Sequence, residues 1–300
     1  MRSISRCVFA ASLLAATLSF CLPAQAQWYD DQEAPAGSAK ILSPFTFKGF
    51  NIASGGQLSS WIAPGNDVLG LTFLLRGGYA FDAMPIYIGL ELPLSAGMPD
   101  GGDEEFVLGS IGLNFKARID PDNPRANVFT GWSFDIYIPT FMGEVDARTN
   151  TPSIGHGTGL YNTLMPGIHV SPEAITTVGT FDLVLPGHLL FFQFELSAAS
   201  YFPVTDIDSR SIEGALAWGA ALGVHIAEPI AFLIEGKGYT PLGGEDEDGS
   251  PLPTQFALSP GFRMKFGPFH PAVWVALPLN REYREVWSDI IIGIDLAIWL

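Results

Sequence analysis

Hydrophobic residues alternate with small or polar residues along much of the chain, most clearly in the final segment, Asp289 to Leu300. Its aliphatic series is Ile290, Ile292, Ile294, Leu296, Ile298 and Leu300. In a β-strand, two alternating series point to opposite faces of a sheet. We therefore predict a final strand with one aliphatic face and one face that carries Asp289 and Asp295.

The same alternation recurs in segments separated by turn residues, and it predicts about twelve strands. The predicted strands cover 41–54, 69–81, 86–94, 106–119, 127–139, 158–171, 188–203, 214–226, 230–239, 254–266, 271–279 and the final segment. Short turns alternate with longer loops, which is typical of an up-and-down barrel whose two rims carry connections of different length. We expect the final strand to close the sheet by pairing with the first strand, near 41–54.

The region 142–203 allows two assignments. The favoured one places strands at 158–171 and 188–203, joined by a long turn. The other makes 176–186 the sixth strand and leaves 142–175 as one large external loop. Both keep an even number of strands, and therefore both place the two ends of the barrel on the same side.

A weak internal repeat supports this division of the chain. Five predicted strands end in an apolar residue or Thr, then Pro, then a short side chain, and the prolines are Pro93, Pro139, Pro203, Pro241 and Pro278. Because proline donates no hydrogen bond to a ladder, it is best tolerated near strand ends or bulges.

The first residues have the pattern of an export signal. Arg2 and Arg6 precede an apolar run from Val8 to Phe20, and Ala24-Gln25-Ala26 follows it. This pattern predicts a signal peptide over 1–26. Cys21 would suggest a lipid anchor, but the bulky Phe20 before it disfavours one. Residues 27–39 are predicted to be an unstructured periplasmic lead-in, and 40–300 a single barrel domain.

Cysteine usage and charge narrow the functional classes. Cys7 and Cys21 both lie in the predicted signal peptide, so the mature chain would have no disulfide, catalytic thiol or zinc–thiolate site. Without the signal peptide, 13 basic residues face 31 acidic ones and the net charge is −18, which argues against a nucleic-acid partner. The most apolar mature stretch, 215–234, is interrupted by His225, Glu228 and Pro229, and therefore does not predict a membrane helix.

Strand length separates a barrel from a secreted β-sandwich, which also alternates. The predicted strands run to roughly a dozen residues, near the length that crosses a bilayer at a tilt and longer than the usual five or six. On these features the chain resembles bacterial outer-membrane β-barrel proteins, which typically carry a C-terminal strand of alternating apolar residues read by the assembly machinery. Leu300 departs from that pattern, because an aromatic residue is usual there and Trp299 lies on the other series.

The resemblance implies an all-β, antiparallel up-and-down transmembrane barrel in the cell outer membrane. It also implies contact with outer-membrane lipid and lipopolysaccharide, and insertion by the barrel-assembly machinery. We predict a passive, porin-like channel or a structural barrel. The alternatives are a barrel enzyme acting on lipid or lipopolysaccharide, and a secreted soluble β-protein that binds carbohydrate.

Twelve charged residues are predicted to face the lumen if the aliphatic series face lipid. They are Arg76, Lys116, Arg118, Lys237, Arg263 and Lys265 against Glu91, Asp135, Glu195, Glu235, Asp289 and Asp295. Buried charges need partners, so this balanced set fits either a lumen crossed by ion pairs or a narrow aqueous pore with charged walls. Arg118, Arg263 and Lys265 fall near the short-turn rim, where a pore would favour anions.

No catalytic residue, metal or cofactor is predicted. Barrel phospholipases resemble one another in a His-x-Ser-Asn-Gly run, which this chain lacks. His156 lies in a glycine-rich run whose flexibility is the simpler explanation. The remaining histidines stand singly, at His169, His188, His225 and His270. The acidic segments 100–105 and 245–248 offer oxygen ligands for calcium but lack the spacing of a calcium loop, so we expect solvated loops.

Overall fold

The computed structural model describes residues 55–64, 68–81, 86–99, 105–108, 110–119, 128–140, 174–185, 189–203, 212–227, 229–243, 254–280 and 290–299. These residues form thirteen strands: β1 Gly55–Pro64, β2 Val68–Phe81, β3 Ile86–Pro99, β4 Glu105–Leu108, β5 Ile111–Ile119, β6 Phe129–Ile138, β7 Ala174–Leu185, β8 Leu190–Pro203, β9 Ile212–Ala227, β10 Ile230–Gly243, β11 Gln255–Met264, β12 Phe269–Pro278 and β13 Ile291–Trp299. The described residues include no helix that is long and apolar enough to cross a membrane.

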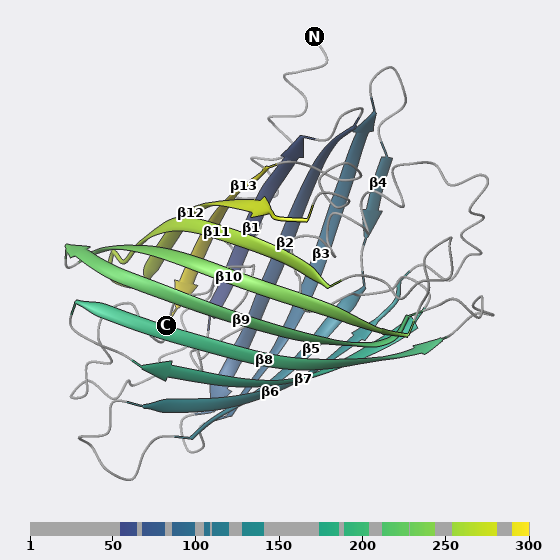
Figure 1. Cartoon of the computed structure of the whole chain (residues 1–300), viewed down its shortest axis with the longest axis horizontal. Helices are drawn as coiled ribbons and strands as arrows, with labels where there is room; N and C mark the ends of the chain where they lie inside the picture. The colour runs from purple at the N-terminus through teal and green to yellow at the C-terminus, as the bar shows by residue number, and fades with distance from the viewer. Residues whose placement is uncertain are drawn as a thin grey trace.

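The strands close into a barrel. Their order is β2-β1-β13-β12-β11-β10-β9-β8-β7-β6-β5-β3-β4, and β2 also pairs with β3, so the ring has no open end. β4 and β5 both pair with β3, at different heights, and the described strands therefore fill twelve positions around the ring. Opposite walls tilt in different directions, as expected for strands that coil around a barrel axis (Figure 1). The predicted antiparallel up-and-down barrel is confirmed.

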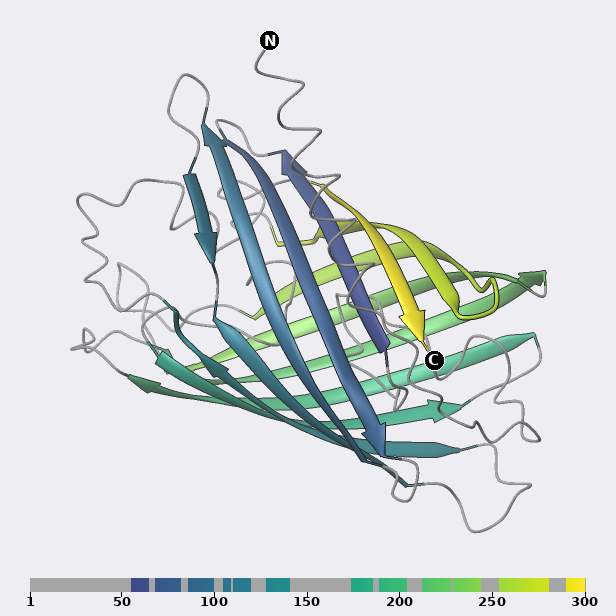
Figure 2. The same cartoon turned by 180° about the vertical axis from the view of Figure 1, so that it is seen from behind.

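The strand that closes the barrel is not where the sequence pattern placed it. β13 pairs with β1, from Gly55 opposite Trp299 to Ile62 opposite Ile292, and the two strands lie side by side in Figure 2. The prediction that the last strand pairs near 41–54 is therefore wrong, and 41–54 lies outside the described residues. The alternation in β1 is interrupted by Gly55, Gly56 and the adjacent serines 59 and 60, which read as turn residues.

Within 142–203, the predicted strand 188–203 is confirmed as β8, but the strand favoured at 158–171 is wrong. β6 pairs directly with β7, and β7 pairs directly with β8, so the strand between them is 174–185. This matches the alternative at 176–186, while 158–171 lies outside the described residues. The signal in β7 is weak because both of its faces are mixed: Val178 faces inward, and Thr177 and Gly179 face outward.

Two smaller departures concern strand ends. The predicted strand 106–119 is divided into β4 and β5 around Ser110. Pro139 follows β6 directly, and Pro203 and Pro278 end β8 and β12, but Pro93 and Pro241 lie inside β3 and β10. The shared ending is therefore confirmed at three of the five positions.

The two rims differ as the sequence predicts. One rim carries the connections 82–85, 120–128, 186–189, 228–229 and 265–268, together with the start of β1 and the end of β13. The other carries the longest connection, 139–173, between β6 and β7. Both ends of the barrel therefore lie on the short-turn side, which is the usual arrangement for a barrel with short turns at one rim and longer loops at the other.

The outer surface is apolar. Its exposed side chains include Leu222, Phe262, Ile292 and Ile294, from strands on different sides of the barrel. Aromatic pairs gather near the short-turn rim: Tyr79–Phe81, Trp132–Phe181 and Phe232–Phe262, with ring centroids 4.8 to 5.3 Å apart. Aromatic residues at the edges of an apolar outer band are typical of barrels that span membranes.

Candidate functional site

The interior face of the barrel carries the charges that the alternation predicts. Eight of the twelve predicted residues are buried there: Arg76, Glu91, Asp135, Glu195, Glu235, Lys237, Arg263 and Asp295. Lys116 and Lys265 are partly buried. Lys116 lies opposite the buried Tyr87 on β3 and the buried Ser133 on β6, which places it on the same face. The side chains of Arg118 and Asp289 fall outside the described residues.

One interior charge was not predicted. Asp182, on β7, is only 3% exposed and faces the lumen. It was missed because its strand was misplaced. The described interior side chains therefore include six acids and four bases, Arg76, Lys116, Lys237 and Arg263. A fifth base, Lys265, is partly exposed at the rim. The predicted balance of six acidic and six basic residues is therefore not found among the described residues of the lumen.

A local sequence signal would have found Asp182. Every described interior acid stands between two outward-facing neighbours, and in five of the six cases both neighbours are large and apolar. Those runs are Leu90-Glu91-Leu92, Phe134-Asp135-Ile136, Phe181-Asp182-Leu183, Phe194-Glu195-Leu196 and Ile294-Asp295-Leu296. The sixth, Ile234-Glu235-Gly236, has one such neighbour.

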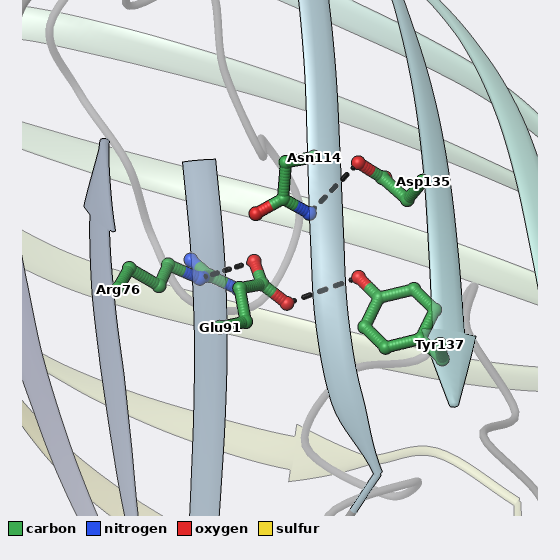
Figure 3. Close-up of polar contacts among 5 residues, drawn as sticks. All are labelled: Arg76, Glu91, Asn114, Asp135 and Tyr137. Atoms are coloured by element: carbon green, nitrogen blue, oxygen red, sulfur yellow. Dashed lines mark hydrogen bonds and ion pairs between the residues drawn. The ribbon is translucent and has the colours of Figure 1, made fainter. Parts of the chain in front are cut away.

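The wall from β2 to β6 holds two groups of polar contacts, one around Glu91 and one between Asn114 and Asp135 (Figure 3). Arg76 lies directly opposite Glu91, and its Nε is 2.6 Å from Glu91 Oε1 in an ion pair. The Tyr137 hydroxyl donates a hydrogen bond of 3.0 Å to Glu91 Oε2. Both carboxylate oxygens of Glu91 are therefore engaged, which offsets the cost of burying its charge.

A glycine makes the second of these contacts possible. Gly112 on β5 lies between Glu91 and Tyr137 in the same cross-strand row. A Cβ built on Gly112 would come within 2.6 Å of Tyr137 Cε1. The missing side chain leaves the space through which the Tyr137 ring reaches across β5 to Glu91.

The next rows of this wall combine an amide, a cation and a ring. Asn114 Nδ2 donates a hydrogen bond of 2.8 Å to Asp135 Oδ1 on the facing strand. The Lys116 ammonium lies 5.2 Å from the centre of the Tyr87 ring, within the range of a cation–π contact. Each charge of this wall therefore has a complementary neighbour.

β7 and β8 are different, because Asp182 and Glu195 lie directly opposite each other in the register. The Ser197 hydroxyl donates a hydrogen bond of 3.2 Å to Glu195 Oε1, and Ser197 and Thr180 share one of 3.0 Å. Lys116 and Asp135 are the other charged groups that act on Asp182 electrostatically.

The opposite wall mixes both signs. Arg263 on β11 interacts electrostatically with Glu235 on β10 and with Asp295 on β13. Ala272 lies between Arg263 and Asp295 in one cross-strand row. Charges of both signs are thus interleaved on β10, β11 and β13.

The interior half nearer the long-loop rim is mostly apolar, although Ser110 and Thr176 are buried there. A buried cluster draws residues from β2, β6, β7, β8, β9, β10, β12 and β13: Leu74, Tyr137, Ala174, Val178, Ala199, Tyr201, Ala215, Ala217, Tyr239, Trp274, Ala276 and Ile291. The charges therefore form a belt that lies closer to the short-turn rim. We call this belt the charged belt.

The described residues show no arrangement that would hold a metal ion by three or more His, Cys, Asp or Glu side chains. His225 lies near the short-turn rim, with its ring 5.2 Å from that of Phe191. His156, His169 and His188, and the acidic segments 100–104 and 245–248, lie outside the described residues, and of Glu105 only the backbone is described.

Comparison with known proteins gives the fold. No protein-family model matches the chain, and no curated protein matches its sequence. Solved structures do match. A NanC porin structure is 8% identical, with a TM-score of 0.53, over 82% of this chain and 100% of the porin.

Two further solved structures match this chain with lower TM-scores. The transport unit of the autotransporter AIDA-I from Escherichia coli is 11% identical over 97% of this chain and 96% of that unit, with a TM-score of 0.44. LpxR from Salmonella typhimurium is 11% identical over 82% of this chain and 100% of LpxR, with a TM-score of 0.42. At these scores neither adds to the argument. Ring closure and the similarity to the porin show that the chain has the closed antiparallel barrel fold of outer-membrane β-barrel proteins.

Proposed function

We propose that the protein is a narrow passive channel of a bacterial outer membrane. In this proposal residues 1–26 direct export, the barrel-assembly machinery inserts the chain, and the apolar outer surface contacts outer-membrane lipid and lipopolysaccharide. The protein has no catalytic role. The observation that carries the proposal is the charged belt inside a closed barrel.

The belt favours a channel over a purely structural barrel because its charges are costly. A charge taken out of water costs several kcal/mol unless its surroundings compensate it. The described belt holds six carboxylates against four buried or partly buried bases and one base at the rim. Mobile ions in the lumen would balance the excess, and a barrel of twelve strands is wider than the eight-stranded barrels that side chains alone fill.

The passage is narrow in this proposal. Most side chains of the belt are less than one-tenth exposed, Asp135, Glu235 and Asp295 to 1% or less. Large aromatic side chains, including Tyr137 and Trp274, occupy the interior above the belt. We therefore expect small ions to pass and bulky solutes to be held back.

Planar-bilayer recording tests the proposal. Protein that migrates as a folded, heat-modifiable barrel on a gel is expected to give discrete conductance steps of small amplitude. The matched control is the same preparation after thermal unfolding, which should give none. Folded protein that conducts no ions would overturn the channel, and release of acyl chains from lipid or lipopolysaccharide by that protein would favour the barrel enzyme instead.

A further inference from the structure

Large aromatic side chains inside the barrel rest on glycine residues of the neighbouring strands. Six aromatic side chains are buried among the described interior residues, and four of them show this arrangement. The four are spread around the wall: Tyr87 on β3 over Gly78, Tyr137 on β6 over Gly112, Phe191 on β8 over Gly223, and Trp274 on β12 over Gly293. The other two are Tyr201 and Tyr239.

The fit between ring and glycine is closest at Phe191 and Trp274. A Cβ built on Gly223 would overlap the Phe191 ring at Cζ and Cε1, and one built on Gly293 would overlap the Trp274 ring at Cζ2 and Cε2. In both cases the three atoms nearest to the added carbon all belong to the ring. The ring therefore occupies the place of the missing side chain and lies along the wall, across the neighbouring strand.

These two rings belong to one cross-strand row of the sheet. The row joins interior positions on the six consecutive strands from β8 to β13, and in it a large apolar residue alternates with glycine: Phe191, Gly223, Leu233, Gly261, Trp274 and Gly293. Glycine in the interior of a strand weakens the strand, and it often marks a place where another group approaches closely. In this row every large side chain has glycine beside it.

The direction of these rings matters because the lumen has little spare room beside them. Phe191 is 2% exposed and Trp274 is 3% exposed, although both face the interior. A side chain that faced a wide, water-filled lumen would be exposed, so the passage beside these rings is narrow. A ring that turned away from the wall would enter that passage. One added methyl group is enough to turn it, because a Cβ on Gly223 or Gly293 would take the place in which the ring now lies.

We infer that Gly223 and Gly293 set the width of the channel by holding Phe191 and Trp274 flat against the wall. This inference rests on the proposed channel function and deepens it, because it names residues that decide which solutes are small enough to pass. The two glycines act through the rings and do not contact the solute, so they are positioning residues.

The test is the single-channel conductance of the full-length, folded protein in a planar bilayer with potassium chloride on both sides. Gly223→Ala is expected to lower the conductance at least about twofold, which corresponds to a barrier raised by about 0.4 kcal/mol. Gly293→Ala should act in the same direction. Polyethylene glycols of graded size give a second readout, because the largest polymer that enters the lumen and reduces the conductance should be smaller in both variants.

Removing the ring distinguishes a narrowed passage from a damaged barrel. Gly223→Ala/Phe191→Ala carries the same added methyl group but has no ring to displace, and it is expected to restore at least the wild-type conductance. Gly179→Ala and Gly236→Ala are the matched controls, because a Cβ on either of these outward-facing glycines would have nothing within 4 Å. Both controls should keep the wild-type conductance.

Heat-modifiable migration on a gel shows whether each variant folds. If Gly223→Ala does not fold, Gly293→Ala and its rescue Gly293→Ala/Trp274→Ala are measured in its place. If neither glycine variant folds, Phe191→Ala and Trp274→Ala decide, and both should conduct at least as well as the wild type. Folded glycine variants with wild-type conductance, a fall that ring removal does not restore, or ring-removal variants that conduct less than the wild type would overturn the inference and leave the channel intact. Folded wild-type protein without any conductance would overturn the channel and the inference together.

Discussion

The space at Gly112 gives the sharpest test of how the interior is built. The change is Gly112→Ala, which adds one methyl group between Glu91 and Tyr137. The new Cβ would lie 2.6 Å from Tyr137 Cε1, 3.0 Å from Tyr137 Cδ1 and 3.1 Å from Glu91 Cβ. Contacts this short require the ring to move, because the clash is with ring carbons close to the strand and not with the end of a flexible chain.

The expected cost has two parts. Overpacking a filled site destabilises a protein by about 1–3 kcal/mol. Moving the ring also breaks the hydrogen bond from Tyr137 to Glu91, and a hydrogen bond to a charged group contributes about 1.5–3 kcal/mol. Alanine recovers about 0.5–1 kcal/mol, because glycine loses more freedom on folding. We therefore expect Gly112→Ala to lower the free energy of unfolding by about 1.5–5.5 kcal/mol.

The assay is guanidinium unfolding of the barrel in lipid vesicles, followed by tryptophan fluorescence. Gly179→Ala is the matched control, because a Cβ on this outward-facing glycine of β7 would have nothing within 4 Å. Tyr137→Phe isolates the hydrogen bond, and Gly112→Ala/Tyr137→Phe should cost clearly less than the sum of the single changes. If Gly112→Ala is as stable as Gly179→Ala, or if the two effects simply add, the proposed coupling through Gly112 is refuted.

Two further substitutions test other contacts by the same unfolding assay and by hydrogen exchange. Arg76→Met leaves the buried Glu91 without its ion-pair partner and should cost about 3–5 kcal/mol, whereas Arg76→Met/Glu91→Gln should recover much of that loss; equal stability of the two would contradict the ion pair. Asn280→Ala removes two hydrogen bonds, one of 2.6 Å donated by Phe256 N and one of 3.0 Å donated to Thr254 O. We expect the free energy of unfolding to fall by about 1–2 kcal/mol and the Phe256 amide to exchange faster. Asn280→Asp keeps the acceptor and should preserve that protection.

The outer face of the barrel was predictable because it repeats one simple rule. An outward position in lipid or at an apolar surface accepts almost any aliphatic residue, so the series in β2, β3, β6 and β13 stands out from the sequence alone. That series fixed the inward positions by elimination, and eight predicted interior charges were located correctly. The rule failed in β1 and β7, where glycine, serine and threonine interrupt the outward series.

Interior contacts were not predictable in the same way, because they depend on register. Tyr137 and Glu91 are 46 residues apart, and their contact requires Gly112 to stand between them in one row. A shift of one residue in either pairing would turn Gly112 or Tyr137 to the outer face. Asp182 shows the same dependence, since its place opposite Glu195 follows only once β7 is paired with β8.

The two kinds of interior wall have different physical consequences. Where an acid faces a base or an amide, as Glu91 faces Arg76 and Asp135 faces Asn114, the pair lowers the cost of burying charge and can be understood as part of the fold. Asp182 and Glu195 face each other directly, and a hydrogen bond between their side chains requires the two carboxyl groups to share a proton. The two walls therefore lower the cost of buried carboxyl groups in different ways, one by pairing an acid with a base or an amide and the other by pairing two acids through one proton.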